Sequence, residues 1–250
     1  MKEQKKSDYY DILRKKEWRN TADFGPSIRA RYKILVGLAK QYGKKDGFIL
    51  DCGCGEGNLL KLLVRQGFNN LSGSDFSDEA IKLTKDKFKG LLYKIDLTQK
   101  KDFQNKKYDL IICSEVLEHI QNDRLAIRNL YNVLNKNGIL ILSVPFSLGY
   151  WSKHDDFSGH VRRYENNELE EKLKTENFHI LESFGWGNII YPLYYRLLTK
   201  IDPSTVMNNK RGVLKFIKVI VSKILFYVFF LEEISKSKKR ARRIFIIANK

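Results

Sequence analysis

The chain has 250 residues, of which 43% are hydrophobic and 30% are charged. Its four prolines and its lack of biased repeats exclude collagen-like, proline-rich and largely disordered proteins, and its length allows one substantial hydrophobic core. Lys and Arg number 46 against 29 Asp and Glu, giving a formal net charge of +17. This excess favours an anionic partner: nucleic acid, a membrane surface or an acidic metabolite.

The cysteines and the first residues indicate the compartment. Cys52, Cys54 and Cys113 lie in or beside apolar runs and form no C-x-x-C pair, which favours reduced core thiols over a zinc site. Residues 1–8 lack the apolar stretch of a secretory signal. We therefore expect a cytoplasmic protein.

Segments of strand length and segments with helical spacing alternate along the chain. The predicted helices are Pro26–Tyr42, Leu59–Gln66, Asp78–Phe88, Asp123–Leu134 and Asn167–Asn177. Most of the predicted strands are rich in Ile, Leu and Val without strict alternation, as is typical of strands covered on both faces. The predicted strands are Phe48–Cys52, Leu71–Asp75, Leu91–Ile95, Tyr108–Cys113, Ile139–Val144, His179–Phe184 and Ile244–Ala248. This alternation predicts an α/β sheet with right-handed crossovers.

A glycine-rich loop follows the first predicted strand. Gly53, Gly55 and Gly57 occupy alternate positions before a predicted helix, where they permit a tight turn and close approach of a ligand. The dinucleotide pattern G-x-G-x-x-G is not met, because its last position is Asn58. The alternative is a flexible turn without a ligand.

Acidic residues end or follow several predicted strands. Asp75 lies about 20 residues past the glycines, where a carboxylate can bind both hydroxyls of a ribose. It could instead cap the next helix, although Ser77 or Asp78 suits that role better. Ligands of open α/β sheets bind at the carboxyl ends of strands. A positively charged ligand suits the acidic residues there, which are Asp51, Asp75, Asp96 and Glu115.

Taken in order, these features resemble the class I S-adenosylmethionine-dependent methyltransferases of types 11 and 23, which include the ubiquinone-pathway O-methyltransferases. The matching elements are the D-x-G-x-G-x-G loop, the acidic end of strand two, the Asp after strand three, residues 108–115 and the turn at 137–140. They cover roughly residues 25–187 and the final strand. The resemblance implies a Rossmann-like seven-stranded α/β sheet whose last strand, Arg243–Asn249, runs antiparallel.

The resemblance also implies the cofactor, S-adenosylmethionine, and the residues around it. Asp51 and the glycines would surround its methionine part, Asp75 would hold the ribose, and Asp96 with Leu97 would flank the adenine. The full predicted set is Asp51, Gly53, Gly55, Gly57, Asp75, Phe76, Asp96, Leu97, Ser114 and Glu115.

The segment after strand four offers a candidate base. Glu115, Glu118 and His119 stand at i, i+3 and i+4, so one helical turn would place them on one face. His119 could then act as general base or metal ligand. The alternative is a solvated acidic helix start.

A second cluster, residues 154–164, follows strand five and contains His160. A polar surface loop is the alternative interpretation. With the E-x-x-E-H segment it resembles the metal site of the small-RNA terminal-ribose methyltransferases, and E-x-x-E-H alone resembles that of the ubiquinone-pathway enzymes. The resemblance implies a divalent metal held by Glu115, Glu118, His119 and His160; without it, His119 and His160 are the candidate catalytic bases. Residues 114–117 lack the Asn/Asp-Pro-Pro-aromatic sequence of base N-methyltransferases, which favours an oxygen acceptor.

The long connection between strands six and seven contains Val213–Leu231, an apolar segment interrupted by Lys215, Lys218 and Lys223. These lysines argue against a membrane-spanning helix and favour one lying in a membrane interface. A basic cluster at 236–243 would attract anionic headgroups. The alternative is a lid over the substrate pocket.

We therefore expect three parts: an N-terminal helical cap (1–47), a methyltransferase core (48–187 with 243–250) and a helical lid or membrane-contacting insertion (188–242). The expected function is O-methylation of a small or lipid-linked acceptor by a cytoplasmic enzyme, peripheral at the inner membrane face and in contact with its anionic surface. An RNA ribose methyltransferase is the alternative, although nucleic acid is the less expected partner. A non-catalytic binding protein is a third.

Overall fold

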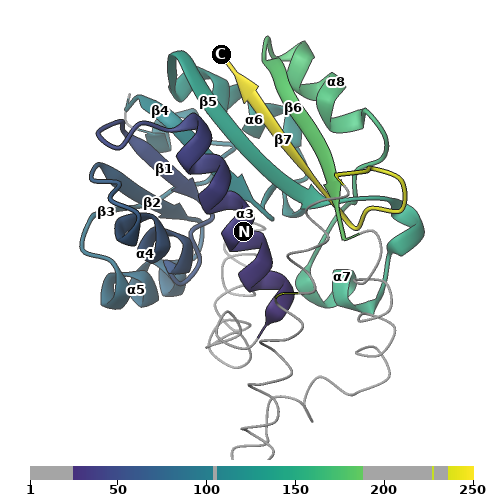
Figure 1. The fold of residues 1–250 in the computed structure, drawn as a ribbon, viewed down its shortest axis with the longest axis horizontal. Coiled ribbons are helices and arrows are strands. Elements are labelled where there is room, and N and C mark those ends of the chain that lie inside the picture. Colours follow the sequence, from purple (N-terminus) through teal and green to yellow (C-terminus); the bar gives the residue numbers. More distant parts are fainter. Residues whose placement is uncertain (1–24, 104–105, 188–226, 228–235) are drawn as a thin grey trace, which may run out of the picture.

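The fold is built on one seven-stranded sheet, seen in a computed structural model that describes residues 25–103, 106–187, 227 and 236–250 (Figure 1). The strand order is β3-β2-β1-β4-β5-β7-β6. Neighbours among β1 to β5 pair in parallel, and β7 runs antiparallel to both β5 and β6. The strands are β1 (Ile49–Cys52), β2 (Leu71–Asp75), β3 (Leu91–Lys94), β4 (Tyr108–Ser114), β5 (Leu134–Pro145), β6 (His179–Trp186) and β7 (Arg243–Asn249).

Helices cover both faces of the sheet. One hydrophobic cluster joins the sheet to α3 and α4, and a second joins the opposite face to α6 and α8. The described helices are α3 (Pro26–Tyr42), α4 (Asn58–Arg65), α5 (Asp78–Lys87), α6 (Asp123–Val133), α7 (Lys153–Ser158) and α8 (Glu168–Thr175), with short 3-10 helices η1 (Lys100–Phe103), η2 (Leu117–His119) and η3 (Leu148–Tyr150).

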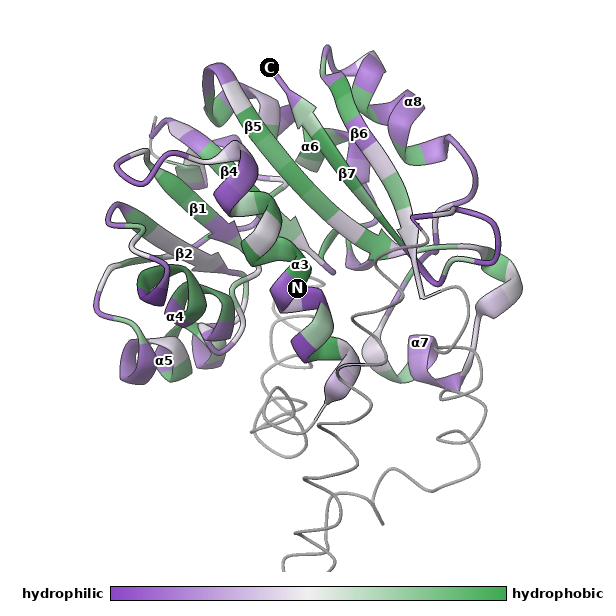
Figure 2. Ribbon diagram, in the orientation of Figure 1, coloured by the Kyte–Doolittle hydropathy of each residue, from purple (hydrophilic) through white to green (hydrophobic). Residues whose placement is uncertain are grey.

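The central strands send alternate side chains into the two clusters. In β5, Leu140 and Leu142 belong to the cluster with α6, whereas Ile141 between them belongs to the cluster with α3. This explains the unbroken apolar runs, because successive residues of a strand point to opposite faces and here both faces are buried. The central strands are accordingly hydrophobic along much of their length (Figure 2).

The α/β fold and the antiparallel last strand are confirmed; α3 has the predicted bounds, and β7 has the bounds that the resemblance implies. The third strand is an exception to the expected coverage on both faces. β3 is the sheet edge, ends at Lys94 and leaves Leu91 62% exposed. The stretch 154–164 also contains a short helix, α7, which the sequence did not predict. Ser152 begins it with a capping box to Asp155.

Two of the expected parts lie largely outside the described residues. These are residues 1–24 of the expected cap and most of the 188–242 insertion, including the expected interfacial helix. Among the residues that the structure describes, no helix combines the length and hydrophobicity needed to cross a membrane.

Candidate active site at the carboxyl ends of the strands

The glycine loop turns sharply between β1 and α4. Gly53, Gly55 and Gly57 all have positive φ angles, a conformation that glycine adopts without strain. A Cβ on Gly53 would lie 2.3 Å from Cγ2 of Val116. Only glycine therefore allows the loop to pack against the segment that leads to Glu118 and His119.

Two carboxylates lie under this loop. Asp75 accepts hydrogen bonds from the amides of Gly55 and Ser77, each at 3.0 Å. Asp51 is buried, and no described residue forms a hydrogen bond with its Oδ2. Burial and the nearby charge of Asp75 raise the pKa of Asp51 to about 8. The two carboxylates therefore lie at the base of the glycine loop, where they suit a cationic ligand.

The remaining predicted cofactor residues lie at or just after the ends of strands β2, β3 and β4. Phe76 is half-buried after β2. Asp96 accepts hydrogen bonds from the amide and hydroxyl of Thr98, and the Leu97 carbonyl accepts one from Asn129. The Ser114 hydroxyl lies 2.7 Å from that of Ser143. Their role in binding a cofactor stays a prediction.

Glu115 does not share a helical face with Glu118 and His119, so that expectation is wrong. Its φ of 57° places it in a left-handed turn before η2. Its carboxylate forms an ion pair with Arg31 of α3 (3.0 Å) and accepts a hydrogen bond from Arg243 of β7 (2.8 Å). Burial opposes ionisation, but the two guanidinium groups outweigh it and hold the pKa of Glu115 below its usual range.

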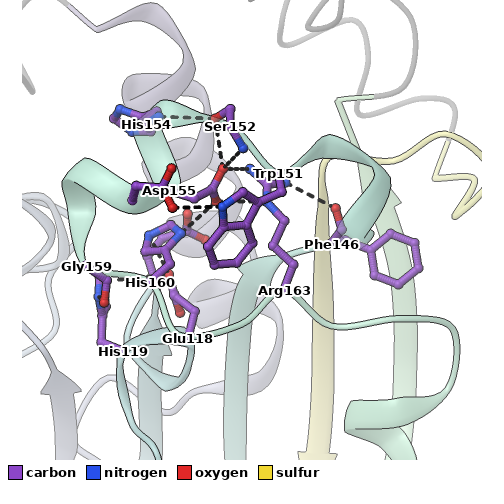
Figure 3. A network of polar contacts seen from close by, with 12 residues as sticks. Glu118, His119, Phe146, Trp151, Ser152, His154, Asp155, Gly159, His160 and Arg163 are labelled. Carbon is purple, nitrogen blue, oxygen red and sulfur yellow. Dashed lines mark hydrogen bonds and ion pairs between the residues drawn. The ribbon is translucent and has the colours of Figure 1, made fainter.

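Glu118, His119 and His160 do converge. One ligand atom from each lies within 4.8 Å of the others. Oε1 of Glu118 lies 4.0 Å from Nε2 of His119 and 3.9 Å from Nε2 of His160. The two rings meet edge to face with their centroids 4.7 Å apart (Figure 3). Three donors typical of a metal site thus face one another.

The Glu118 carboxylate is the least satisfied group of this cluster. Its side chain is fully buried, and no described residue gives either oxygen a hydrogen bond. Burial, together with the charge of Glu115, raises its pKa well above the usual range. A buried carboxylate is costly unless it is protonated or paired with a cation.

A second layer of contacts fixes His160. Its Nδ1 lies 2.8 Å from Oδ1 of buried Asp155 (Figure 3). Arg163 donates to both oxygens of Asp155, at 2.8 and 3.0 Å, and the amide and hydroxyl of Ser152 donate to Oδ2. Since Nδ1 is used by Asp155, Nε2 of His160 is the nitrogen that faces Glu118.

Four residues of this site were absent from the sequence-based set. Asp155 and Arg163 lie in the stretch 154–164, where a carboxylate five residues before His160 was the available signal. No sequence signal marked Arg31 or Arg243, because each contacts Glu115 only in the folded structure.

The chain resembles known proteins in sequence. A family model described as a methyltransferase domain matches residues 28–183. The ubiquinone biosynthesis O-methyltransferase of Rickettsia canadensis is 31% identical over 150 residues, which are 56% of this chain and 63% of that protein. The chain thus matches less than two thirds of that relative's length. The protein of the same name from Rickettsia prowazekii is 29% identical over 216 residues, covering 76% of this chain and 83% of that protein.

A solved structure shares the fold. The crystal structure of magnesium protoporphyrin IX methyltransferase from Synechocystis PCC 6803 with bound SAH matches with a TM-score of 0.65 and 16% identity, covering 100% of both chains. At this identity the likeness concerns the fold alone.

Proposed function

Because this chain belongs to the S-adenosylmethionine-dependent methyltransferases, we propose that it methylates a hydroxyl oxygen of a small or lipid-linked acceptor at a membrane surface. The observation that supports an oxygen acceptor is the convergence of Glu118, His119 and His160 beside the glycine loop. A hydroxyl must lose its proton during transfer, and these groups offer the means to remove it.

The described residues fit S-adenosylmethionine. Asp51 has a buried oxygen without a described hydrogen-bond partner, and it lies at the base of the positive-φ glycine loop. Such a carboxylate suits an ammonium group, and the acidic strand ends suit a ligand that carries positive charge. When bound, this cofactor supplies an electrophilic methyl group on a sulfonium.

Glu118, His119 and His160 fit a divalent cation. Two imidazole nitrogens and a carboxylate form a donor set that first-row divalent metals accept, and Glu118 lacks any other described partner. Glu118, His119 and His160 would hold the ion, whose charge would lower the pKa of the acceptor hydroxyl. Asp155 would orient His160 from behind, as carboxylates often do for metal-binding histidines.

Transfer itself requires positioning and removal of one proton. The chain would hold the acceptor oxygen in line with the cofactor's methyl carbon, so that the new oxygen–carbon bond would form as the carbon–sulfur bond breaks and leaves its electron pair on sulfur. The hydroxyl proton leaves to a base. If no metal is used, Nε2 of His160 is the best-placed base, because its Nδ1 is already hydrogen-bonded to Asp155.

The test is incubation of the protein with methyl-labelled cofactor and an extract of the source cells, followed by separation of lipid, nucleic acid, protein and small molecules. We expect label in the lipid or small-molecule fraction and its loss in His119→Ala and His160→Ala. His179→Ala, which removes an exposed histidine at the start of β6, is the matched control. Label in RNA would replace this proposal with ribose methylation, and activity unchanged by exhaustive chelation would refute the metal role.

A further inference from the structure

A cavity of about 290 Å³ lies beside the candidate active site. Phe146, the residue after β5, belongs to its wall. The Phe146 carbonyl also accepts a hydrogen bond from Arg163, the residue that holds Asp155 (Figure 3). Arg163 and Asp155 therefore connect the cavity wall to His160. Its volume is near the lower limit for ligand pockets and suits one small polar group.

The cavity has a basic wall. Residues 238–241, which precede β7, form one side, and Ser147, Tyr150, Glu165 and Asn166 lie on the other. The backbone holds the basic segment in a turn, since the Ala241 amide donates to the Lys238 carbonyl at 3.1 Å. The Tyr150 hydroxyl reaches across to the Arg240 carbonyl at 3.4 Å.

Several basic side chains near this wall already have partners. Lys238 pairs with Glu170, Lys236 with Glu182, and Arg243 with Glu115. The Arg242 guanidinium lies 3.7 Å from the centre of the Tyr150 ring.

Lys239 and Arg240 differ from these neighbours. Within the described ranges, no residue forms a hydrogen bond or ion pair with either side chain. Glu165 also lines the cavity, and its carboxylate accepts the Leu148 amide at 2.6 Å. The lining therefore holds Lys239 and Arg240, two cations without a described ion-pair partner, against the single carboxylate of Glu165.

Two residues of the cavity wall hold unusual backbone conformations. Ser147 has a φ of 62° and Arg240 a φ of 63°, both in the left-handed region that non-glycine residues rarely occupy. Such conformations persist only where the surrounding structure fixes them, and they gather at ligand sites. The turn that carries the two basic side chains therefore has a fixed backbone conformation.

We propose that this cavity binds a phosphate or diphosphate group carried by the acceptor. Lysine and arginine are the side chains that bind phosphate oxygens best, and the Ser147 hydroxyl and Asn166 amide add neutral donors. The assignment of this group to the acceptor rests on the proposed function. The anion site itself does not, because it concerns residues outside the methyl-transfer cluster.

Calorimetric titration of the full chain with inorganic diphosphate, without cofactor, tests the site. We expect binding in the wild type and a rise in Kd of about tenfold or more in Lys239→Ala/Arg240→Ala, because each lost charge-assisted hydrogen bond weakens binding. The control is Lys61→Ala/Arg65→Ala, which removes the same charges from the exposed face of α4. Absence of binding, or equal weakening in the control, overturns the site whether or not the chain methylates hydroxyls.

A second measurement identifies the source of the phosphate. The same three proteins are mixed with phosphatidylcholine vesicles with and without phosphatidylglycerol. Loss of vesicle binding in Lys239→Ala/Arg240→Ala alone would support the site with a lipid headgroup as its occupant. If the three proteins instead behave alike with vesicles while Lys239→Ala/Arg240→Ala still loses diphosphate binding, the result would support a phosphorylated acceptor in solution.

Discussion

Oδ1 of Asp155 lies 2.8 Å from Nδ1 of His160, and this contact decides which imidazole nitrogen faces the site. Burial opposes ionisation of Asp155, but hydrogen bonds from His160 and Arg163 outweigh it and hold its pKa well below the usual range. An ionised carboxylate accepts a proton donor. Nδ1 therefore carries hydrogen, and Nε2 is left as the reactive or metal-binding atom.

Asp155→Asn should lower activity about 10- to 100-fold, because an amide can donate to Nδ1 and favour the wrong tautomer. Nitrogen NMR of His160 measures the tautomer directly, and rate measurements measure its effect. Removing the charge also leaves Arg163 buried without its partner, which should lower the free energy of unfolding by about 3 kcal/mol.

Arg163→Lys separates the orientation of His160 by Asp155 from the contribution of the Asp155–Arg163 ion pair to the stability of the fold. It loses the two-pronged contact with Asp155 but leaves the Asp155–His160 hydrogen bond intact. It should reduce stability while retaining most activity at a temperature where both variants are folded. If Asp155→Asn kept the wild-type tautomer and rate, the orienting role would be wrong.

Glu118→Gln should stabilise the metal-free protein as the pH rises above about 4.3, the ordinary pKa of glutamate. The folded-state pKa of Glu118 is raised, so between the two values the unfolded chain releases a proton that the folded chain keeps, and stability falls with rising pH. Glutamine has no such proton. Thermal melting across pH in the presence of a chelator measures this difference.

The same variant should lose the stabilisation that Mn²⁺ gives the wild type, because Glu118 supplies the only carboxylate of the described donor set. The control is Glu171→Gln, which changes an exposed carboxylate of α8. Equal stabilisation of all three proteins by Mn²⁺ would contradict the proposed metal site.

Asp51 should make cofactor binding depend on pH. Its pKa is raised to about 8, and an ionised carboxylate binds the cofactor's ammonium group better than a neutral one. Affinity for S-adenosylmethionine should therefore rise with pH toward about 8 and fall again where the cofactor's own ammonium group loses its proton. Calorimetry should show this rise in the wild type and a weaker, flatter profile in Asp51→Asn. A wild-type profile without slope would argue against Asp51 as the ammonium partner.

Glu115→Gln should lower the free energy of unfolding by about 3 kcal/mol, because it removes a counter-charge shared by the partly buried guanidiniums of Arg31 and Arg243. Asp78→Asn breaks the exposed pair with Lys94 and should cost less than about 1 kcal/mol. Urea unfolding of both variants gives the comparison. Similar losses would mean that the partly buried triad of Arg31, Glu115 and Arg243 adds little to stability.

Much of the fold was predictable because its signals are local. Pro26 at the first turn marked the start of α3, and the glycines after β1 marked the turn into α4. The edge position of β3 was not predictable, since an apolar segment such as 91–95 reads the same whether its faces are covered or open.

The site was predictable only in part, for a geometric reason. His119 and His160 were identified from the sequence because histidine can act as a base or a metal ligand. The fold then brings their rings together. The helical spacing from Glu115 to His119 was misleading, because the left-handed turn at Glu115 directs its carboxylate to Arg31 and Arg243 instead. Those partners lie 84 residues before and 128 residues after it, beyond any local pattern.

The place of β7 sets an order on folding during synthesis. β6 pairs only with β7 among the described strands, and β7 pairs with both β5 and β6. On the ribosome, the earlier strands can pair as they emerge, but β6 has no neighbour until residues 187–242 and then β7 have followed. Arg243, the first residue of β7, also completes the binding of Glu115. A nascent chain halted within that stretch would therefore have its glycine loop and histidines but an unfinished site.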